Sequence, residues 1–440
     1  MATLKLYSDN KDFSFIIRKN PASGMMAKSM RKGTVFGWYG KDDTYCIAFF
    51  DGMDVISFGK KQNQEFAFLD QTQYNAPLFL PNALREFFQT VMKNQDEKDV
   101  PGHKNVLEVS AIEIKRMPIF EKLVSCFHGF DVEFSPIPHE KDKAEQEGRY
   151  RYGTYSLKIS TERTLHDLLN LGYLIGYLIA ICSRVEFIAE TNVIRKLLEE
   201  SNSLNLPYYV SHLIKTGCIH SQKEYEKAKD LLNVSRENES FKFAVGTNSD
   251  ERYFWVKERL PNETDILDFG CGEGKFFYLA KKMTSATYYA VDKDESARDL
   301  ARKRVKRLGL ENIVILESLE DFFQLETGNP FVVIASEVFE HNPLSDMDVV
   351  FRKFMENPDC RKILVTTPNK DFNKFYGLEE NETRHEDHVN EMRKEDAVKW
   401  FSDLVKGTEF SSKSYNLGDE VNGIPSILAF SLERKGGDEK

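Results

Sequence analysis

Apolar and polar positions follow two different rhythms along the chain. In the first half, short runs alternate between apolar and polar residues, which is typical of strands because successive side chains point to opposite faces. The predicted strands are residues 34–39, 45–50, 108–115 and 131–134, with helices near 81–92 and 119–126. From residue 164 to about 232 the apolar spacing becomes helical. We therefore expect residues 1–235 to form an α+β module with a helical end.

Polar stretches separate these elements. Residues 93–105 and 139–149 are rich in charged and turn-forming side chains, which predicts surface loops, and residues 236–250 are expected to be a linker. The longest apolar run, residues 168–181, contains an asparagine and two glycines. Because this run is shorter than the roughly 18 residues that a membrane span needs, we expect a buried helix and no membrane partner.

From residue 266 the rhythm changes to an alternation of strand, loop and helix. The predicted strands are residues 266–269, 287–291, 312–316, 331–336 and 362–367, with helices at 275–283 and 295–308. Such alternation predicts a doubly wound, mostly parallel sheet whose ligands bind at the carboxyl ends of the strands. We assign residues 251–434 to this α/β domain and 435–440 to a tail.

Composition limits the class of protein. The chain has 440 residues, 41% of them hydrophobic and 30% charged, which is enough apolar material for two or three globular domains. The net charge of −10 argues against non-specific coating of nucleic acid, although a local basic groove remains compatible with it. The six cysteines are scattered without a C-x-x-C pair, and the first residues lack a signal-peptide pattern. We therefore expect a cytoplasmic protein without disulfides.

A glycine-rich loop is the sharpest local signal. The segment Asp268-Phe-Gly-Cys-Gly-Glu-Gly274 follows a predicted strand and opens a predicted helix. Glycines at 270, 272 and 274 let a ligand lie against the backbone, because no Cβ intervenes. Asp268 can receive a ligand ammonium, and Asp292, 24 residues further on, can bind two ribose hydroxyls. A tight structural turn is the alternative, which the strand, the helix and Asp292 together disfavour.

A second cluster of polar residues follows the fourth strand of this domain. Glu337, Glu340 and His341 would share one face if they formed the first turn of a helix. Two adjacent carboxylates repel each other, and a divalent cation would resolve the repulsion. The segment Arg384-His-Glu-Asp-His388 offers further ligands, and this mixture suits Mn²⁺, Co²⁺ or Fe²⁺ better than Mg²⁺. The alternative is an acidic, solvated helix start.

These motifs resemble those of a known family. The glycine loop and the later acid are similar to class I S-adenosylmethionine-dependent methyltransferases. The ordered set DFGCGEG, SEVFEH, VTTPNKDFN and RHEDH resembles the RNA 3′-terminal ribose 2′-O-methyltransferases of small RNAs. The first half, at residues 12–21 and 151–157, resembles the bacterial form of that family.

The resemblance implies roles for particular residues. The metal ligands would be Glu337, Glu340, His341 and His388, with His388 preferred over His385; the cation would be Mn²⁺, or else Mg²⁺ or Co²⁺. Ser318 and Leu319 would pack against the adenine of S-adenosylmethionine, Arg384 would be an essential site residue, and Thr366, Thr367 and Asn369 would line the nucleotide pocket. Two departures from the family pattern are Asn342-Pro343 after His341 and residues 389–392 after His388.

The resemblance also implies a reaction and partners. The cation would hold the 2′ and 3′ oxygens of an RNA 3′ end with free hydroxyls, and His341 or a neighbouring imidazole would take the proton. The partner would be a bacterial polynucleotide kinase, phosphatase and ligase, whose ligation the N-terminal module stimulates. Two alternatives remain: a catechol-type O-methyltransferase, and a ligase-activating interaction protein with a vestigial methyltransferase half.

Overall fold

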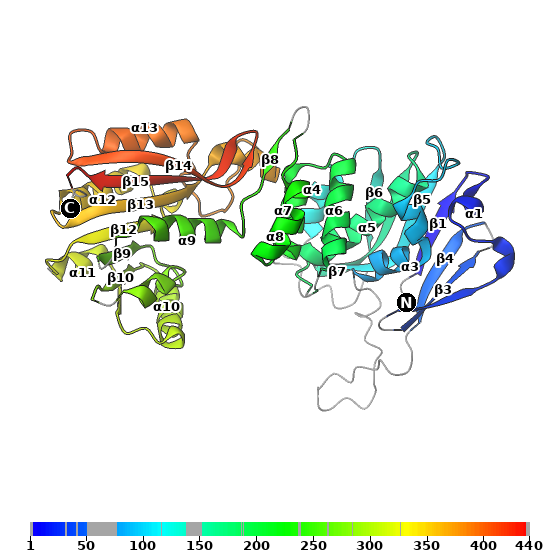
Figure 1. Cartoon of the computed structure of the whole chain (residues 1–440), viewed down its shortest axis with the longest axis horizontal. Coiled ribbons are helices and arrows are strands. Elements are labelled where there is room, and N and C mark those ends of the chain that lie inside the picture. The colour runs from blue at the N-terminus through cyan, green and yellow to red at the C-terminus, as the bar shows by residue number, and fades with distance from the viewer. Residues whose placement is uncertain are drawn as a thin grey trace, which may run out of the picture. The chain divides into compact units, whose positions relative to one another are not determined.

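The computed structural model describes residues 3–30, 33–40, 43–50, 77–115, 117–137, 152–185, 187, 189–235, 239–261, 264–283, 285–325 and 327–436. The chain forms two compact units, Met1–His220 and Ser221–Lys440 (Figure 1). The predicted loop at 139–149 lies outside the described residues.

Among its described residues, the N-terminal unit forms an antiparallel sheet of seven strands in the order β2-β3-β4-β1-β5-β7-β6. The strands are β1 (Thr3–Ser8), β2 (Met26–Met30), β3 (Gly33–Tyr39), β4 (Tyr45–Phe50), β5 (Asn105–Lys115), β6 (Asp131–Pro136) and β7 (Tyr152–Thr161). The four strands predicted from alternation are therefore confirmed.

The N-terminal unit also contains helices. They are α1 (Phe13–Ile16), α3 (Phe79–Lys93), α4 (Met117–Val124), α5 (Leu165–Cys182), α6 (Thr191–Ser203) and α7 (Tyr208–Cys218), with a short 3₁₀ turn at Pro21–Ser23. In length and hydropathy α5 could cross a membrane, but 83% of it is buried inside the protein. A Cβ at Gly172 would lie 2.6 Å from Leu107, and one at Gly176 would lie 2.5 Å from Pro81. The two glycines thus let this helix approach β5 and α3 closely, as suits a core helix.

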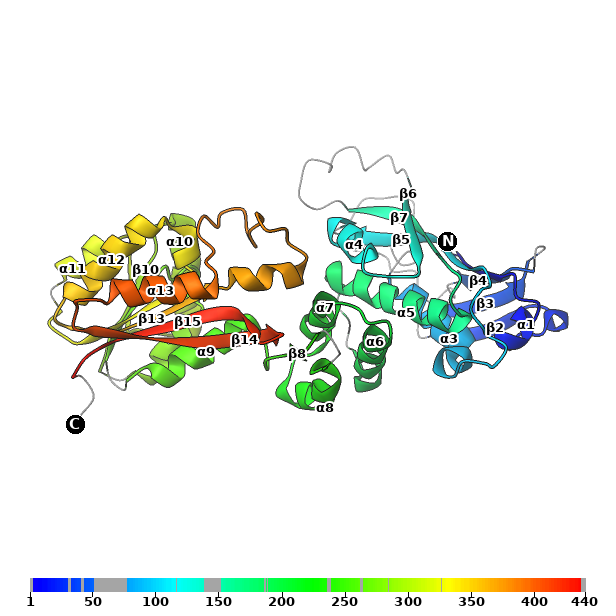
Figure 2. The ribbon, with the colours of Figure 1, turned by 90° about the horizontal axis from the view of Figure 1, so that it is seen from above.

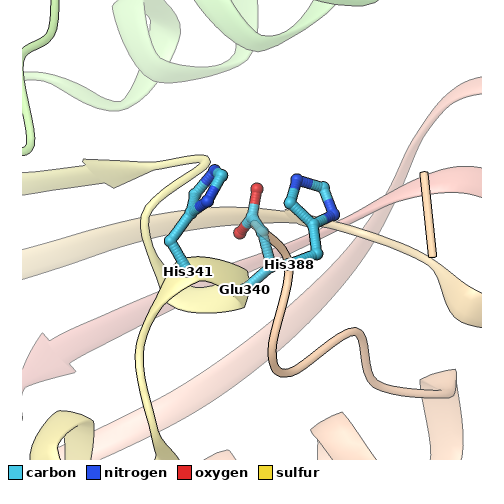
Figure 3. A group of neighbouring side chains, drawn as sticks. All are labelled: Glu340, His341 and His388. Atoms are coloured by element: carbon cyan, nitrogen blue, oxygen red, sulfur yellow. The ribbon is translucent and has the colours of Figure 1, made fainter. Parts of the chain in front are cut away.

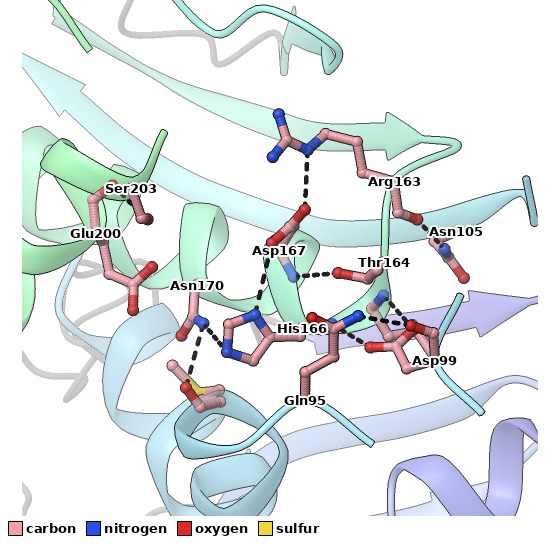
Figure 4. Close-up of polar contacts among 12 residues, drawn as sticks. Gln95, Asp99, Asn105, Arg163, Thr164, His166, Asp167, Asn170, Glu200 and Ser203 are labelled. Atoms are coloured by element: carbon pink, nitrogen blue, oxygen red, sulfur yellow. Dashed lines mark hydrogen bonds and ion pairs between the residues drawn. The ribbon is translucent and has the colours of Figure 1, made fainter. Parts of the chain in front are cut away.

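The stretch at 93–105 is a loop, as predicted. The prediction that it lies on the surface is wrong in part, because one of its residues is buried. Asp99 is 1% exposed, and its carboxylate accepts hydrogen bonds from the backbone N–H groups of Leu165 and His166, each at 2.8 Å. Thr164 caps the same helix by accepting from the N–H of Asp167 (Figure 4). Because the first N–H groups of a helix have no partner within it, this loop completes the start of α5.

The C-terminal unit contains an eight-stranded sheet in the order β11-β10-β9-β12-β13-β15-β14-β8. The strands are β8 (Phe241–Lys242), β9 (Asp265–Phe269), β10 (Tyr288–Val291), β11 (Ile313–Leu316), β12 (Phe331–Ser336), β13 (Cys360–Pro368), β14 (Phe410–Val421) and β15 (Ile424–Arg434). The first five in spatial order are parallel, and β15, β14 and β8 are antiparallel (Figure 2). A doubly wound, mostly parallel sheet is confirmed.

The C-terminal unit also contains helices. They are α8 (Gln222–Leu232), α9 (Asn248–Arg259), α10 (Glu295–Leu308), α11 (Leu319–Gln324), α12 (Leu344–Glu356) and α13 (Lys394–Leu404), with 3₁₀ segments η4 (Phe277–Lys282), η5 (Phe339–His341) and η6 (Lys370–Tyr376). One apolar core joins the sheet to α11, α12 and α13, and a second joins the other face to α9, η4 and α10 (Figure 1). The α-helix predicted at 275–283 is thus a 3₁₀ helix.

The predicted linker at 236–250 contains ordered structure. Phe241 in β8 pairs with Val421 in β14, and Thr247 forms a capping box with Asp250 at the start of α9. Tyr225, in α8, donates a hydrogen bond to the carbonyl oxygen of Phe243. These contacts attach the described part of the stretch to the C-terminal unit.

Candidate active site

The glycine loop leaves β9 with its backbone fixed by the neighbouring strand. The N–H groups of Gly270 and Cys271 both donate to the carbonyl oxygen of Val291, at 2.8 and 3.0 Å. Gly270, Gly272 and Gly274 all have positive φ, and a Cβ at Gly270 or Gly274 would collide with a side chain at 2.3 Å. A Cβ at Gly272 would meet nothing within 4 Å. The middle glycine therefore presents bare backbone to open space, which fits a ligand lying on the loop.

Asp292 lies beside this loop, as predicted from its place after the next strand. Its Oδ2 atom accepts from the N–H of Gly272 at 2.8 Å, and its Oδ1 atom accepts from the N–H of Asp294 at 2.9 Å. The carboxylate is partly exposed. Its position at the carboxyl end of β10 suits the predicted contact with ribose hydroxyls.

Asp268 is the buried acid of the loop. Its Oδ2 atom accepts a hydrogen bond of 2.7 Å from the phenol of Tyr288, which is fully buried. Burial raises the pKa of Asp268 to about 7, although the hydrogen bond from Tyr288 opposes the increase. A ligand ammonium would favour the ionised carboxylate. Asp268 can therefore bind a cationic amino group, and Tyr288 fixes the orientation of its carboxylate.

Ser318 and Leu319 have structural explanations. Ser318 caps α11, since its hydroxyl accepts from the N–H of Asp321 and its own N–H donates to the carboxylate of Asp321. Leu319 is 9% exposed and belongs to the core on that face of the sheet. Their predicted contact with adenine remains a prediction.

Three candidate ligands gather beyond the end of β12. Ligand atoms of Glu340, His341 and His388 all lie within 4.8 Å of one another (Figure 3). The first two residues belong to η5, whereas His388 lies on the loop before α13. That loop is attached to the turn, because the N–H groups of Val389 and Asn390 both donate to the carbonyl oxygen of Glu340.

Glu340 has one carboxylate oxygen engaged and one available. Its side chain is fully buried, and its Oε2 atom accepts from the Thr367 hydroxyl at 3.1 Å. The Oε1 atom is buried without a partner. Burial, and then the charge of nearby Glu337, raise the pKa of Glu340 well above its usual range. A buried carboxylate oxygen without a partner is costly, and a cation would satisfy it.

The Nδ1 atom of each imidazole in the group lies next to a carboxylate. His341 Nδ1 lies 3.2 Å from Asp387 Oδ2, and His388 Nδ1 lies 2.5 Å from Glu391 Oε1. If Nδ1 donates in both pairs, each Nε2 atom keeps its lone pair for a metal ion. Together with Glu340 Oε1, these nitrogens form a donor set that fits a divalent transition metal.

Glu337, the fourth predicted ligand, is not in this group. It has a left-handed φ of 57°, and its Oε2 atom forms an ion pair of 2.6 Å with Arg252 on α9. Its Oε1 atom is buried without a partner. The predicted helical turn through 337–341 is replaced by this left-handed residue and the 3₁₀ turn, and α12 starts only after Pro343. A metal role for Glu337 remains a prediction.

Arg384 and His385 lie in the loop that carries His388. The guanidinium of Arg384 donates to the carbonyl oxygens of Asn369 and Ser426 and to the Oδ1 atom of Asn373, so it attaches the loop to the end of the sheet. His385 is exposed, and its ring centroid lies 5.1 Å from that of His388. The geometric group thus contains His388 and not His385.

Residues expected to line a nucleotide pocket are instead internal. Thr366, Thr367 and Asn369 are all 0% exposed. Thr367 binds Glu340, Thr366 shares a hydrogen bond of 2.8 Å with Ser336, and Asn369 donates to the carbonyl oxygen of Pro425. Their place at the end of β13 makes them supports beneath the site, not its surface.

Sequence reasoning missed Glu391, Tyr288 and Arg252. Glu391 is buried, and although burial would raise its pKa, hydrogen bonds from Asn373 and His388 lower the pKa overall. Its spacing of three residues after His388 was a usable signal. For Tyr288 and Arg252 the chain offered none, because their partners lie 20 and 85 residues away in sequence.

Comparison with known proteins agrees with this architecture. Residues 3–237, more than half of the chain, match the family model described as the Hen1 N-terminal domain, and residues 266–357 match a methyltransferase domain. A solved structure described as the Pnkp1/Rnl/Hen1 RNA repair complex contains a chain with 21% identity and a TM-score of 0.76, which covers 98% of this chain and 100% of that one. That likeness establishes a shared fold.

Curated relatives match only parts of the chain. Ribosomal protein L11 methyltransferase of Caldanaerobacter subterraneus subsp. tengcongensis is 37% identical over 119 residues, which is 27% of this chain and 36% of that protein. Small RNA 2'-O-methyltransferase of Drosophila melanogaster is 27% identical over 161 residues, which is 32% of this chain and 40% of that protein. The chain thus spans well under half the length of each of these two relatives.

The sheet order, the glycine loop and the matched domain define the C-terminal unit as a class I methyltransferase domain of the S-adenosylmethionine-dependent type. The match over residues 3–237 goes further, and the chain belongs to the Hen1 family.

Proposed function

We propose that the protein transfers the methyl group of S-adenosylmethionine to the 2′-hydroxyl of the 3′-terminal ribose of RNA, with the help of a divalent cation. The observation that carries the proposal is the group of Glu340, His341 and His388 beside the glycine loop. Because β9, β12 and β13 are parallel, the loop, the group and Thr367 all lie at one edge of the sheet. A methyl donor and a cation would therefore meet there.

The site has two sides: a donor side that binds the cofactor, and an acceptor side that would bind the cation. On the donor side, Asp268 binds the amino group, Asp292 binds the ribose hydroxyls, and Gly272 leaves room for the cofactor, which supplies a methyl sulfonium. On the acceptor side, Glu340 Oε1 and the Nε2 atoms of His341 and His388 would hold the ion. A bound divalent cation supplies Lewis acidity, which lowers the pKa of a hydroxyl and orients it.

Proton transfer requires a different imidazole. If His341 and His388 use Nε2 as ligand atoms, their Nδ1 atoms face Asp387 and Glu391, and neither ring can accept the hydroxyl proton. His385 is exposed beside them and is the neighbouring imidazole that can do so. We expect His385→Ala to lower kcat by about 100-fold while Mn²⁺ affinity measured by calorimetry stays unchanged. Loss of Mn²⁺ binding would instead make this residue a ligand.

The proposal extends to a role in RNA repair. A relative is named Small RNA 2'-O-methyltransferase, and the solved structure that covers almost the whole chain is described as the Pnkp1/Rnl/Hen1 RNA repair complex. The first name supports an RNA ribose as the methyl acceptor, and the second supports a repair complex. An RNA 3′ end as the substrate, and a polynucleotide kinase, phosphatase and ligase as the partner, follow from the motif resemblance. The 2′-O-methyl group would then be added at the 3′ end of a broken RNA before the ligase seals it.

A substrate panel tests the proposal. Labelled S-adenosylmethionine is supplied with an oligoribonucleotide bearing a free 3′ end, the same oligonucleotide with a 3′-phosphate, and a set of catechols. We expect label only in the first, because only that end presents both terminal hydroxyls. Labelled catechols would point to a small-molecule enzyme. Stimulated ligation without any methyl transfer would point to an interaction protein.

A further inference from the structure

Glu391 is a buried carboxylate that touches three residues of the acceptor side. Its side chain is fully buried, and its Oε1 atom lies 2.5 Å from His388 Nδ1 and accepts from the backbone N–H of Arg384 at 2.9 Å. Its Oε2 atom accepts from the side-chain amide of Asn373, which in turn accepts from Arg384 Nε. The carboxylate thus joins the His388 ring to the frame of its loop.

These contacts determine how the His388 ring can sit. A carboxylate accepts hydrogen bonds and does not donate them, so the facing Nδ1 atom must carry the imidazole proton. The Nε2 atom then keeps its lone pair and belongs to the side of the ring that faces Glu340 and His341 (Figure 3). A flip of the ring would break the hydrogen bond and present a carbon to Glu391.

We propose that Glu391 is the positioning residue that fixes the tautomer and orientation of His388, so that its Nε2 atom binds the divalent cation. This inference rests on the proposed function, because it takes His388 to be a ligand of the ion. Acids that hold a ligating imidazole through its second nitrogen typically change metal affinity by about 10–100-fold when removed.

His341 offers a matched comparison within the same site. Its Nδ1 atom also faces a carboxylate, but the Asp387 side chain is 72% exposed whereas that of Glu391 is fully buried. Exposed pairs of this kind contribute little, because water competes for both partners. We therefore expect the hydrogen bond between carboxylate and imidazole to affect metal affinity strongly at Glu391 and only slightly at Asp387.

Mn²⁺ affinity, measured by calorimetry on the full chain without RNA, tests the inference. Glu391→Met keeps the size of the side chain and removes the acceptor, so we expect about 10–100-fold weaker binding. Glu391→Gln keeps one acceptor oxygen and should restore part of the affinity. Asp387→Asn should stay within about threefold of the wild type. The visible spectrum of bound Co²⁺ should change only in the Glu391 variants, while S-adenosylmethionine affinity stays constant in all three.

Wild-type affinity and an unchanged Co²⁺ spectrum in Glu391→Met would overturn the inference. If that variant does not fold, imidazole ¹⁵N NMR of the wild type at pH 8 determines which ring nitrogen of His388 carries the proton. The His388→Gln variant identifies the signals of this residue. A proton on Nδ1 of His388 supports the inference, and a proton on Nε2 overturns it. Failure of the proposed function looks different, since the wild type would then bind no Mn²⁺ or would methylate no RNA.

Discussion

Glu340 is the single residue on which methyl transfer should depend most. Its Oε1 atom is buried without a hydrogen-bond partner and belongs to the group with His341 and His388. We predict that Glu340→Gln lowers methyl transfer by about 100-fold or more, since the charge stabilisation a metal ion supplies is worth several kcal/mol. Calorimetry with S-adenosylmethionine should show unchanged affinity, because the donor side is separate. An exposed control, Glu311→Gln, should retain activity; equal loss of both readouts would make Glu340 merely structural.

Asp268 gives cofactor binding a pH dependence. With a pKa of about 7 in the folded protein, its carboxyl is mostly protonated at pH 6 and mostly ionised at pH 8. A cofactor ammonium favours the ionised form, so affinity for S-adenosylmethionine should rise about tenfold over that interval. Calorimetry at several pH values measures this rise, and Asp268→Asn should abolish it. A flat profile in the wild type would disprove the assignment.

The same group acts on folding stability with the opposite sign. Its pKa is raised from an ordinary value of 3.8, so between about pH 4 and pH 7 the folded chain holds a proton that the unfolded chain has lost. Its contribution to the free energy of unfolding therefore decreases as the pH rises through that window and is constant above it.

At the scale of elements, α9 is attached to the acceptor side through one ion pair. Arg252 on this helix neutralises Glu337, whose second carboxylate oxygen lacks a partner. We predict that Arg252→Met lowers the melting temperature without metal, and that Mn²⁺ raises the melting temperature of this variant more than that of the wild type. The reason is that a cation would replace the lost charge if Glu337 is a ligand.

Thermal unfolding with and without Mn²⁺ measures both effects. Arg259→Met is a control on the same helix, because its guanidinium packs on Trp255 and Tyr415 away from Glu337. If Mn²⁺ shifts Arg252→Met and the wild type equally, the predicted metal role of Glu337 is wrong.

Elements with a strong period were predictable from the sequence. The alternating runs became β3 and β4, and the apolar run at 168–181 became the buried helix α5. The turn at 337–341 was not predictable in this way, because a left-handed backbone at a residue other than glycine, here Glu337, is rare and leaves no trace in the hydrophobic pattern. The prediction that residues 93–105 form a surface loop was wrong in part for a similar reason, because only the folded chain brings Asp99 to the start of α5.

The grouping of residues at the candidate site was predictable from the sequence, whereas the residues that support this group were not. The motifs placed Glu340, His341 and His388 together because each follows a recognisable strand or a distinctive segment. Thr367 was predicted to line a pocket, yet it binds Glu340 from beneath. Glu391 was missed although its spacing after His388 was a usable signal, because spacing alone reveals neither its burial nor the direction of the His388 ring.

At the scale of the whole molecule, the site residues of both the donor and the acceptor side belong to the C-terminal unit, Ser221–Lys440. The N-terminal unit carries the family match over most of its length and has its own core around α5. Under the proposed function, the chemistry would therefore take place in the C-terminal unit.

The most direct test of the central claim is a nucleoside analysis of methylated RNA. The full chain is incubated with S-adenosylmethionine and an RNA ending in a free ribose, with Mn²⁺ or with a chelator, and the product is digested for mass spectrometry. We predict a 2′-O-methyl nucleoside from the 3′ end alone, formed with Mn²⁺ and lost with the chelator. Methylation of a base or an internal ribose, or full activity in the chelator, would contradict a cation held by Glu340, His341 and His388.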